Sequence, residues 1–370
     1  MPSALGDLRV LDFSRVLAGP FATMLMADLG AAVTKIERPG AGDDTRSWGP
    51  PYDDRGTATY FQSVNRNKDV LALDLTAADD LAEARLLART ADVVVENFRP
   101  GVMERLGLGY DELRAANPGL VYCSVTGFGR GAGADLPGYD LLIQALGGLM
   151  HITGEPDGEP QKVGVAVVDV LSGLFATVGI LAALRHRAAT GAGQRVEVDL
   201  LSSLLGALVN QASAYTSGGV APGRMGNRHP SIAPYELLPA ADGELVLAVG
   251  NDRQFRALCA VLGEESVADD PRFATNPARV ANRAALRGLL AERLAARPAA
   301  EWAAACTAAR VPAGVVNDVA GAFRLATELG LAPVVGVPRP DGSLVHLVRN
   351  PIGLSATPPT YRTAPAPLPQ

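Results

Sequence analysis

The sequence is constrained most strongly by the regular alternation of short apolar strands and helices over its first 126 residues. Helices are predicted at 15–30, 77–90 and 111–116, and each lies between two apolar strands. Strands that alternate with helices in this way pair in parallel, with helices on both faces of the sheet and ligands at the carboxyl ends of the strands. The sequence therefore predicts an α/β fold whose site is built from 14–20, 37–40, Asp74, 96–101 and 126–133.

A change of composition predicts a second, smaller domain. The chain has 370 residues, enough for two domains, and Gly and Pro become dense between residues 217 and 234. Helical patterns follow at 252–262, 282–296 and 299–309, and a hairpin is predicted to turn at Asp341-Gly342 before a proline-rich end. We expect a large domain over residues 1–200, a linker over 201–225, a small domain over 226–318, and a return segment over 319–370 that packs on the large domain.

Charge and cysteine content exclude several classes of partner. The 33 Lys and Arg against 39 Asp and Glu give a net charge of −6, which disfavours general binding to nucleic acid or an anionic membrane. Cys123, Cys259 and Cys306 are far apart, so neither a disulfide framework nor a zinc site is indicated. The first residues lack the pattern of a secretion signal, and we expect a cytoplasmic protein.

A helix predicted within residues 163–191 is apolar on almost every side and begins near Asp169. Between Val170 and Leu184 its only polar side chains are Ser172 and Thr177, which predicts a helix buried inside a soluble core. The ordinary interpretation of Asp169 is a helix N-cap, although a capping box would have Glu or Gln where Ser172 stands. The alternative is a carboxylate nucleophile kept dry by apolar walls.

Three further patterns each allow two interpretations. The segment GFGRGA at 127–132 fits a dinucleotide fingerprint, but loop residues follow it, which favours a glycine-rich active-site loop over NAD or FAD binding. Asp140 is either a solvated acid in the first turn of a helix or a residue of the active site, and Tyr139 is either a core tyrosine or a residue of the same site. Four arginines near strand ends are either ordinary surface residues or, if they converge, a phosphate site, namely Arg15, Arg38, Arg99 and Arg105.

Several stretches resemble the class III CoA-transferase family of the CaiB/BaiF type, which includes formyl-CoA transferases and α-methylacyl-CoA racemases. The matching stretches occur in the same order over nearly the whole chain and include 12–46, 65–75, 91–113, 138–154, 167–173 and 226–236. The resemblance implies a Rossmann-like large domain, a smaller α+β domain and an interlocked homodimer. It also implies acyl-CoA and a carboxylic acid as substrates, with CoA bound as part of the substrate and neither metal nor NAD required.

The resemblance also assigns site residues. It places the nucleophile at Asp169, whose carboxylate would form first an anhydride with the acyl group and then a thioester with CoA. Asp140 and Tyr139 match positions near that nucleophile. The positions that match CoA contacts of the family are Val16, Arg38, Leu73, Asn97, Phe98 and Arg105.

Two departures bear on the activity. The related racemases carry His where this chain has Tyr139, so this chain would lack one of the two bases that a racemase needs. A CoA-transferase is therefore favoured. The alternatives are a racemase or epimerase and a non-catalytic CoA-binding protein. Formyl-CoA transferases have Gln where Leu17 stands and a run of glycines where only Gly250 is found. We therefore expect a succinyl-CoA-like donor and a dicarboxylate acceptor such as succinate, glutarate, mesaconate or citramalate rather than oxalate.

Overall fold

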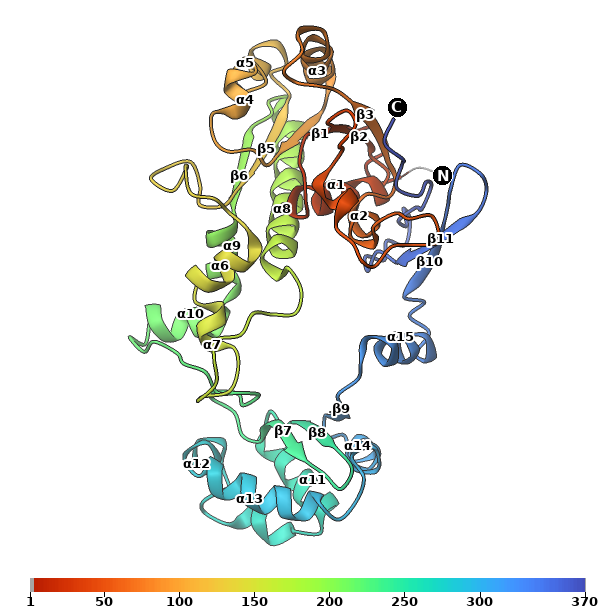
Figure 1. The fold of residues 1–370 in the computed structure, drawn as a ribbon. Coiled ribbons are helices and arrows are strands. Elements are labelled where there is room, and N and C mark those ends of the chain that lie inside the picture. The colour runs from red at the N-terminus through yellow and green to blue at the C-terminus, as the bar shows by residue number, and fades with distance from the viewer. Residues whose placement is uncertain (1–2, 370) are drawn as a thin grey trace. The chain divides into compact units, whose positions relative to one another are not determined.

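The computed structural model describes residues 3–369, which divide into two compact units (Figure 1). The first unit contains the chain up to Leu149, Lys162–Ala221 and the chain from Ala332 onwards. The second contains Met150–Gln161 and Pro222–Leu331. The chain thus enters and leaves the second unit twice, and the return to the first unit begins at Ala332 rather than at the expected residue 319.

The first unit is built on a six-stranded parallel sheet, which confirms the predicted α/β fold. Its strand order is β3-β2-β1-β4-β5-β6, so the direction in which strands are added reverses between β1 and β4. In a sheet of this kind, the loops that follow the two strands at the reversal diverge and leave a crevice for a ligand. The strands are β1 Arg9–Asp12, β2 Ala32–Glu37, β3 Lys68–Ala72, β4 Val93–Glu96, β5 Val121–Thr126 and β6 Arg195–Asp199.

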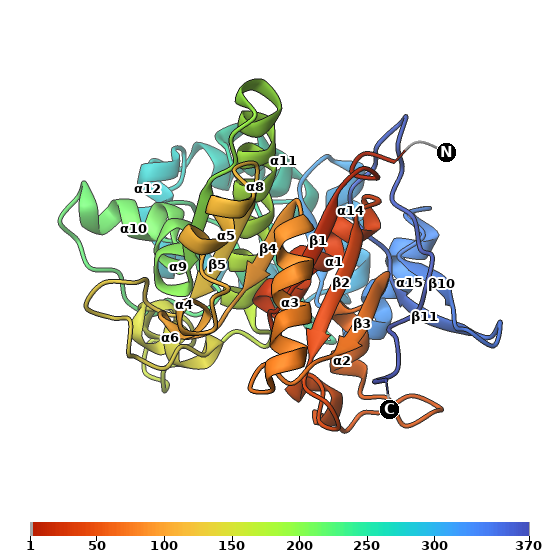
Figure 2. The same cartoon turned by 90° about the horizontal axis from the view of Figure 1, so that it is seen from above.

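Helices cover both faces of this sheet (Figure 2). On one face, α1 (Ala18–Asp28) and α8 (Val167–Thr190) pack on the side chains of alternate strand residues such as Val10. On the other, α3 (Ala78–Thr90) and α5 (Tyr110–Ala116) pack on the intervening residues such as Leu11. Because successive strand residues point to opposite faces, a continuous apolar strand supplies both cores.

Helix α8 departs from the prediction of a helix buried on all sides. It packs on α1, β5, β6 and α9 (Leu200–Ala207) through residues such as Ala176 and Ile180, which are fully buried. Its length and composition would also suit a membrane span, but this packing is that of a core helix. The opposite side is apolar and open to solvent in the single chain, with Leu174, Phe175, Val178 and Leu181 exposed.

The rest of the first unit is made of short elements. Two predicted helices are interrupted. Two short helices replace the single helix predicted at 138–149, and the helix predicted at 200–216 is broken at Val209, where φ is +43°. The predicted hairpin is confirmed, with Gly342 at φ +84° in its turn. The short elements of this unit are η1 Asp44–Ser47, α2 Thr59–Val64, α4 Val102–Arg105, α6 Asp140–Leu146, α10 Val209–Thr216, β10 Val334–Pro338 and β11 Leu344–Val348. The helix α7 Leu149–Ile152 begins at the last residue of this stretch and continues into the second unit.

The second unit has its own core around a three-stranded antiparallel sheet. Its predicted helices are present, and Trp302 and Phe255 are buried between them and the sheet. Its elements are β7 Tyr235–Pro239, β8 Glu244–Ala248, α11 Asp252–Leu262, η2 Glu265–Asp269, α12 Asn276–Ala281, α13 Arg283–Leu294, α14 Ala299–Ala308, β9 Ala313–Val315 and α15 Val319–Glu328.

Candidate active site

A cavity of about 380 Å³ lies in the first unit at the carboxyl ends of the parallel strands. Its walls come from the turn after β1, the loop after β4, the loop after β5 and the first turn of α8. This is the place that the strand order predicts for a ligand. The structure brings together five of the predicted site residues in this wall, namely Val16, Asn97, Phe98, Tyr139 and Asp169.

Asp169 is not the N-cap of α8, so the ordinary interpretation of this residue is wrong. The helix begins at Val167, its N-cap is Ala166, and Asp169 lies in the first turn. The capping role belongs to Asp140 of α6, whose Oδ1 accepts the backbone N–H of Val168 at 2.7 Å and that of Asp169 at 3.3 Å. A capping carboxylate from another helix leaves the side chain of Asp169 free to face the cavity.

Asp169 is a carboxylate without a cation. No ion pair or side-chain hydrogen bond to its oxygens occurs among residues 3–369. Burial, and after it the nearby charge of Asp140, raises the pKa of Asp169 to about 7. At neutral pH the group is therefore divided between its acid and its anion, and the anion is poorly solvated, which favours its use as a nucleophile or a base.

Asp140 and Tyr139 lie at the start of α6, in different environments. Gln144 Nε2 donates to Asp140 Oδ2 at 2.5 Å, so both oxygens of Asp140 have partners. Tyr139 is the N-cap residue of α6, lines the cavity and is 63% exposed, which rules out the interpretation of a core tyrosine. In this arrangement Asp140 positions the beginning of α8, while Tyr139 is open to a ligand.

Tyr60 is a neighbour of the carboxylates that the sequence did not reveal. Burial raises its pKa to about 12, and the charges of Asp169 and Asp140 contribute next. Its ring packs edge-on against Trp48 with the centroids 5.3 Å apart. The helix α2 that carries Tyr60 is short and lies in a polar stretch without apolar periodicity, so no sequence signal marked it.

The residues expected to contact CoA are only partly gathered at the cavity. Asn97 accepts the N–H of Arg15 at 2.9 Å and donates to its carbonyl at 2.7 Å, and the Arg15 guanidinium lies 5.0 Å from the ring centroid of Phe98. Arg38 does not line the cavity but binds Asp44, which does, at 3.1 Å. Leu73 is buried in the core on the α3 side.

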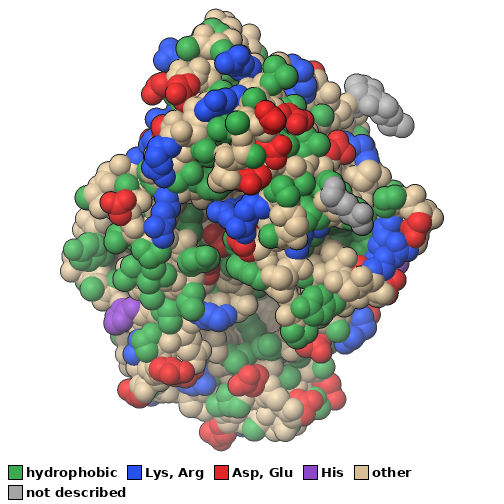
Figure 3. Space-filling model, turned by 45° about the horizontal axis from the view of Figure 1, so that its top comes forward, with side chains coloured by type: hydrophobic (Ala, Val, Ile, Leu, Met, Phe, Trp, Pro, Cys, Tyr) green, Lys and Arg blue, Asp and Glu red, His purple; other side chains and the backbone are tan. Residues whose placement is uncertain are grey.

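The four arginines do not form one uniform basic patch. Arg15 and Arg99 line the cavity, whereas Arg105 is exposed at the end of α4 and lies outside the lining. The space-filling view shows blue basic and red acidic side chains intermingled over this face (Figure 3). Within residues 3–369, no group of three His, Cys, Asp or Glu side chains is arranged to hold a metal ion.

The loop after β5 is shaped by glycine. The backbones of Gly127 and Gly138 cross so closely that a Cβ on Gly127 would lie 2.6 Å from Cα of Gly138. Gly127, Phe128 and Gly129 line the cavity, and no helix begins until Asp140. The segment thus has the geometry of an active-site loop, and it lacks the immediate helix start that a dinucleotide fingerprint requires.

Comparison with known proteins agrees with this geometry. The model for CoA-transferase family III matches residues 5–369. The chain is 44% identical over 363 residues to the succinate–glutarate CoA-transferase of Agrobacterium fabrum, a match that covers 96% of this chain and 91% of that protein. It is also 44% identical to the acetyl-CoA:oxalate CoA-transferase of Acetobacter aceti, covering 86% of this chain and 82% of that one.

Solved structures give the same result. The crystal structure of a CAIB/BAIF family protein from Brucella suis matches with a TM-score of 0.87 and 43% identity, covering 100% of this chain and 97% of the other. A hypothetical protein from Mycobacterium tuberculosis matches with a TM-score of 0.87 and 32% identity, covering 98% and 97%.

The parallel sheet and the unpaired carboxylate at its carboxyl edge define an α/β protein with a reactive group in its ligand cavity. The family match makes this class specific: the chain belongs to CoA-transferase family III, the CaiB/BaiF family. It is a class III acyl-CoA:carboxylate CoA-transferase.

Proposed function

We propose that this enzyme moves CoA from succinyl-CoA, or a similar donor, to a dicarboxylic acid, with Asp169 as the nucleophile. The observation that carries this proposal is the environment of Asp169, a cation-free carboxylate at the wall of a cavity, whose pKa burial raises to about 7. A carboxylate suits the task, because an acyl group that must pass between carboxylates is exchanged most evenly through an anhydride.

In the proposed mechanism, an Oδ of ionised Asp169 attacks the thioester carbonyl carbon of the donor. The C–S bond breaks, CoA leaves as a thiolate, and an anhydride links the acyl group to Asp169. The thiolate then attacks the side-chain carbonyl carbon of Asp169, which releases the donor acid as its carboxylate and leaves CoA on the aspartate as a thioester. The acceptor carboxylate repeats both steps in reverse order, and the enzyme returns to its first state.

The surroundings of Asp169 serve this chemistry in two ways. Leu17, Val125 and Leu200 are buried apolar residues that line the cavity beside it, and they limit the access of water that would hydrolyse an anhydride. The first turn of a 24-residue helix adds the positive end of the helix dipole, which stabilises the anion that attacks and the anion that is released.

The names of the relatives support a dicarboxylate acceptor. Besides the glutarate enzyme, a relative from Haloarcula hispanica named succinyl-CoA:mesaconate CoA-transferase is 44% identical over 298 residues. The oxalate-named relative from Acetobacter aceti keeps oxalate among the acceptors to be tested. Leu17, a buried apolar residue in the cavity wall, favours acceptors whose second carboxylate is separated from the first by methylene groups.

An acceptor screen tests this proposal. The enzyme is incubated with succinyl-CoA and one acid at a time, with glutarate, mesaconate, citramalate and oxalate in the panel, and new thioesters are separated by chromatography. We expect acid-dependent thioesters with the longer dicarboxylates and none with Asp169→Asn. Exchange of an α-proton of the acyl group with deuterated water, without any new thioester, would instead support a racemase.

We also propose that the enzyme is a homodimer. The exposed apolar side of α8, formed by Leu174, Phe175, Val178 and Leu181, supports this, because monomeric proteins seldom leave such a continuous patch in water. Light scattering after size exclusion should give twice the mass of the chain, and Val178→Glu should shift the protein towards monomer. A monomeric wild-type protein at micromolar concentration would contradict the proposal.

A further inference from the structure

Val16 has a backbone conformation that a β-branched residue rarely adopts. It lies in the turn between β1 and α1 at φ +68°, in the left-handed region, and it lines the cavity together with Asp169. Such a conformation persists only where neighbouring groups hold it in place, and it is found most often at functional sites. The contacts that hold this turn are therefore of interest.

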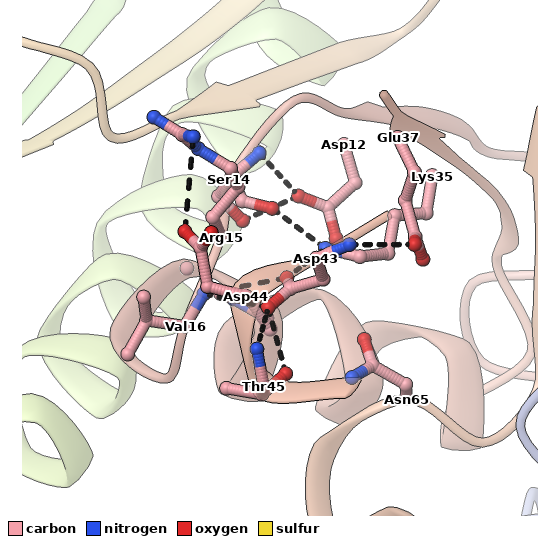
Figure 4. Close-up of polar contacts among 12 residues, drawn as sticks. Asp12, Ser14, Arg15, Val16, Lys35, Glu37, Asp43, Asp44, Thr45 and Asn65 are labelled. Carbon is pink, nitrogen blue, oxygen red and sulfur yellow. Dashed lines mark hydrogen bonds and ion pairs between the residues drawn. The ribbon is translucent and has the colours of Figure 1, made fainter. Parts of the chain in front are cut away.

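Side chains from three other segments bind the backbone of the turn. Asn97 binds both the N–H and the carbonyl of Arg15, and Lys35 Nζ donates to the carbonyl of Ser14 at 2.7 Å. Asp43 accepts the N–H of Val16 at 3.4 Å through Oδ1 and at 3.3 Å through Oδ2. Three consecutive residues thus have their backbone fixed by side chains rather than by secondary structure. Figure 4 shows Lys35 and Asp43 beside Ser14 and Val16.

Lys35 and Asp43 form a fully buried ion pair beneath the turn. Their charged atoms lie 2.9 Å apart, and both side chains have no exposed surface. Asp43 also accepts the N–H of Thr45 at 3.0 Å and its hydroxyl at 2.7 Å, which fixes the start of η1 next to Asp44. A buried ion pair adds little to stability over an apolar pair of the same shape, so its value lies in the geometry that it imposes.

The charges of this cluster are mutually supported. Burial lowers the pKa of Lys35, but the surrounding carboxylates, Asp12 first and then Asp43, outweigh it and raise the pKa overall. Burial acts to raise the pKa of Asp43, but the charge of Lys35 and the hydrogen bonds from Thr45 and Lys35 together outweigh it and lower the pKa. A second buried lysine, Lys68, binds Asp12 at 3.2 Å and the carbonyl of Pro20 at 2.9 Å. The turn is therefore held on both sides by ionised groups.

We propose that Asp43, itself fixed by Lys35, is a positioning residue that holds Val16 in its left-handed conformation and so places the 15–17 turn against CoA beside Asp169. Asp43 lies outside the cavity wall and reaches the site through the backbone of Val16, while Asp44, the residue after it, lines the wall. This inference rests on the proposed function, because it names a supporting group for the same site.

The first test compares two equally buried aspartates. Asp43→Asn keeps an oxygen acceptor but removes the charge that pairs with Lys35. Asp28→Asn is the matched control, because Asp28 is also fully buried and binds Arg66 at 2.9 and 2.6 Å, yet it does not line the cavity. We expect Asp43→Asn to lower the affinity for CoA, measured by calorimetry with CoA alone, by about tenfold or more. The same variant should lower kcat/KM by about tenfold or more. Asp28→Asn should change both quantities by less than about twofold.

The second test is a cycle with Val16→Gly. Glycine adopts a positive φ without steric cost, so a turn with glycine at this position depends less on Asp43. We expect Asp43→Asn to cost only about threefold in CoA affinity in the Val16→Gly background, against about tenfold in the wild-type background. Asp28→Asn should have the same small effect in both backgrounds.

The outcomes separate this inference from the proposed function. Equal effects of Asp43→Asn in the two backgrounds, or equal effects of Asp43→Asn and Asp28→Asn on CoA affinity, would overturn the positioning role. The CoA measurement needs no turnover, so a wild-type enzyme that binds CoA but transfers it to no acid would count against the proposed substrates alone. Thermal unfolding of all variants establishes that each is folded at the assay temperature.

Discussion

Two groups of carboxylates lie near the turn between β1 and α1, and they have opposite electrostatics. Asp12 and Asp43 are paired with Lys68 and Lys35. Burial acts to raise the pKa of each aspartate, but the lysines and the hydrogen bonds to each carboxylate together outweigh it and lower the pKa. Asp169 has no cation, and burial together with Asp140 raises its pKa to about 7. Paired carboxylates give a fixed geometry, whereas an unpaired one remains available for reaction with a substrate.

The largest expected effect is the loss of transfer in Asp169→Asn. The amide cannot form the anhydride, so kcat should fall by a factor of about 10³ or more in the succinyl-CoA assay. CoA binding should change far less, because the residues expected to contact CoA are others. Retention of more than a few per cent of wild-type kcat would show that Asp169 is not the nucleophile.

The second prediction concerns stability: replacing Asp43 should lower the free energy of unfolding, whereas replacing Asp169 should raise it. Asp43→Asn leaves the buried charge of Lys35 without its partner at 2.9 Å, and the free energy of unfolding should fall by about 3 kcal/mol. Urea unfolding at pH 8 measures this change. A variant as stable as the wild type would mean that the cluster is not coupled through ionised groups.

Asp169→Asn should have the opposite effect on stability. Because the pKa of Asp169 is higher in the folded state than in the unfolded chain, the folded state binds the extra proton and the wild type loses stability as the pH rises from about 4 to 7. Removing the charge should therefore raise the free energy of unfolding by about 4 kcal/mol at pH 8 and by almost nothing at pH 4. A destabilised variant at pH 8 would contradict the electrostatic account of this group.

The pH dependence of the reaction follows from the same group. The anion of Asp169 is the nucleophile and its pKa is about 7, so kcat/KM should fall about tenfold per pH unit below that value. A profile that stays flat down to pH 5 would show that the carboxyl is ionised throughout, as an ordinary paired aspartate would be.

The smallest expected effect is a shift of that profile in Asp140→Asn. The asparagine oxygen can still accept the N–H of Val168, so the cap of α8 is kept while the like charge beside Asp169 is lost. The midpoint of the acid limb should move down by less than about one unit, because burial, which remains, is the larger cause of the raised pKa. An upward shift would exclude repulsion between the two carboxylates.

Local patterns were sufficient to predict the strands, most of the helices and the hairpin, because each depends on the spacing of apolar residues and turn formers. They were also sufficient to place Val16 and Asn97 near one edge of the sheet, whereas Asp169 was assigned to the site only through the family resemblance. They did not predict that Asp140 caps α8, since two separate helices must meet for that contact to form. For the same reason no local pattern indicated that Tyr60 lies near Asp169, or that Asp43 binds the backbone of Val16.

One measurement addresses the central claim, that Asp169 carries CoA during transfer. The enzyme is mixed with succinyl-CoA without an acceptor, quenched in acid, digested and analysed by mass spectrometry. The account predicts a CoA thioester on the peptide that contains Asp169, which disappears when an acceptor acid is added and never forms in Asp169→Asn. An adduct on another residue, or complete turnover without any adduct, would contradict it.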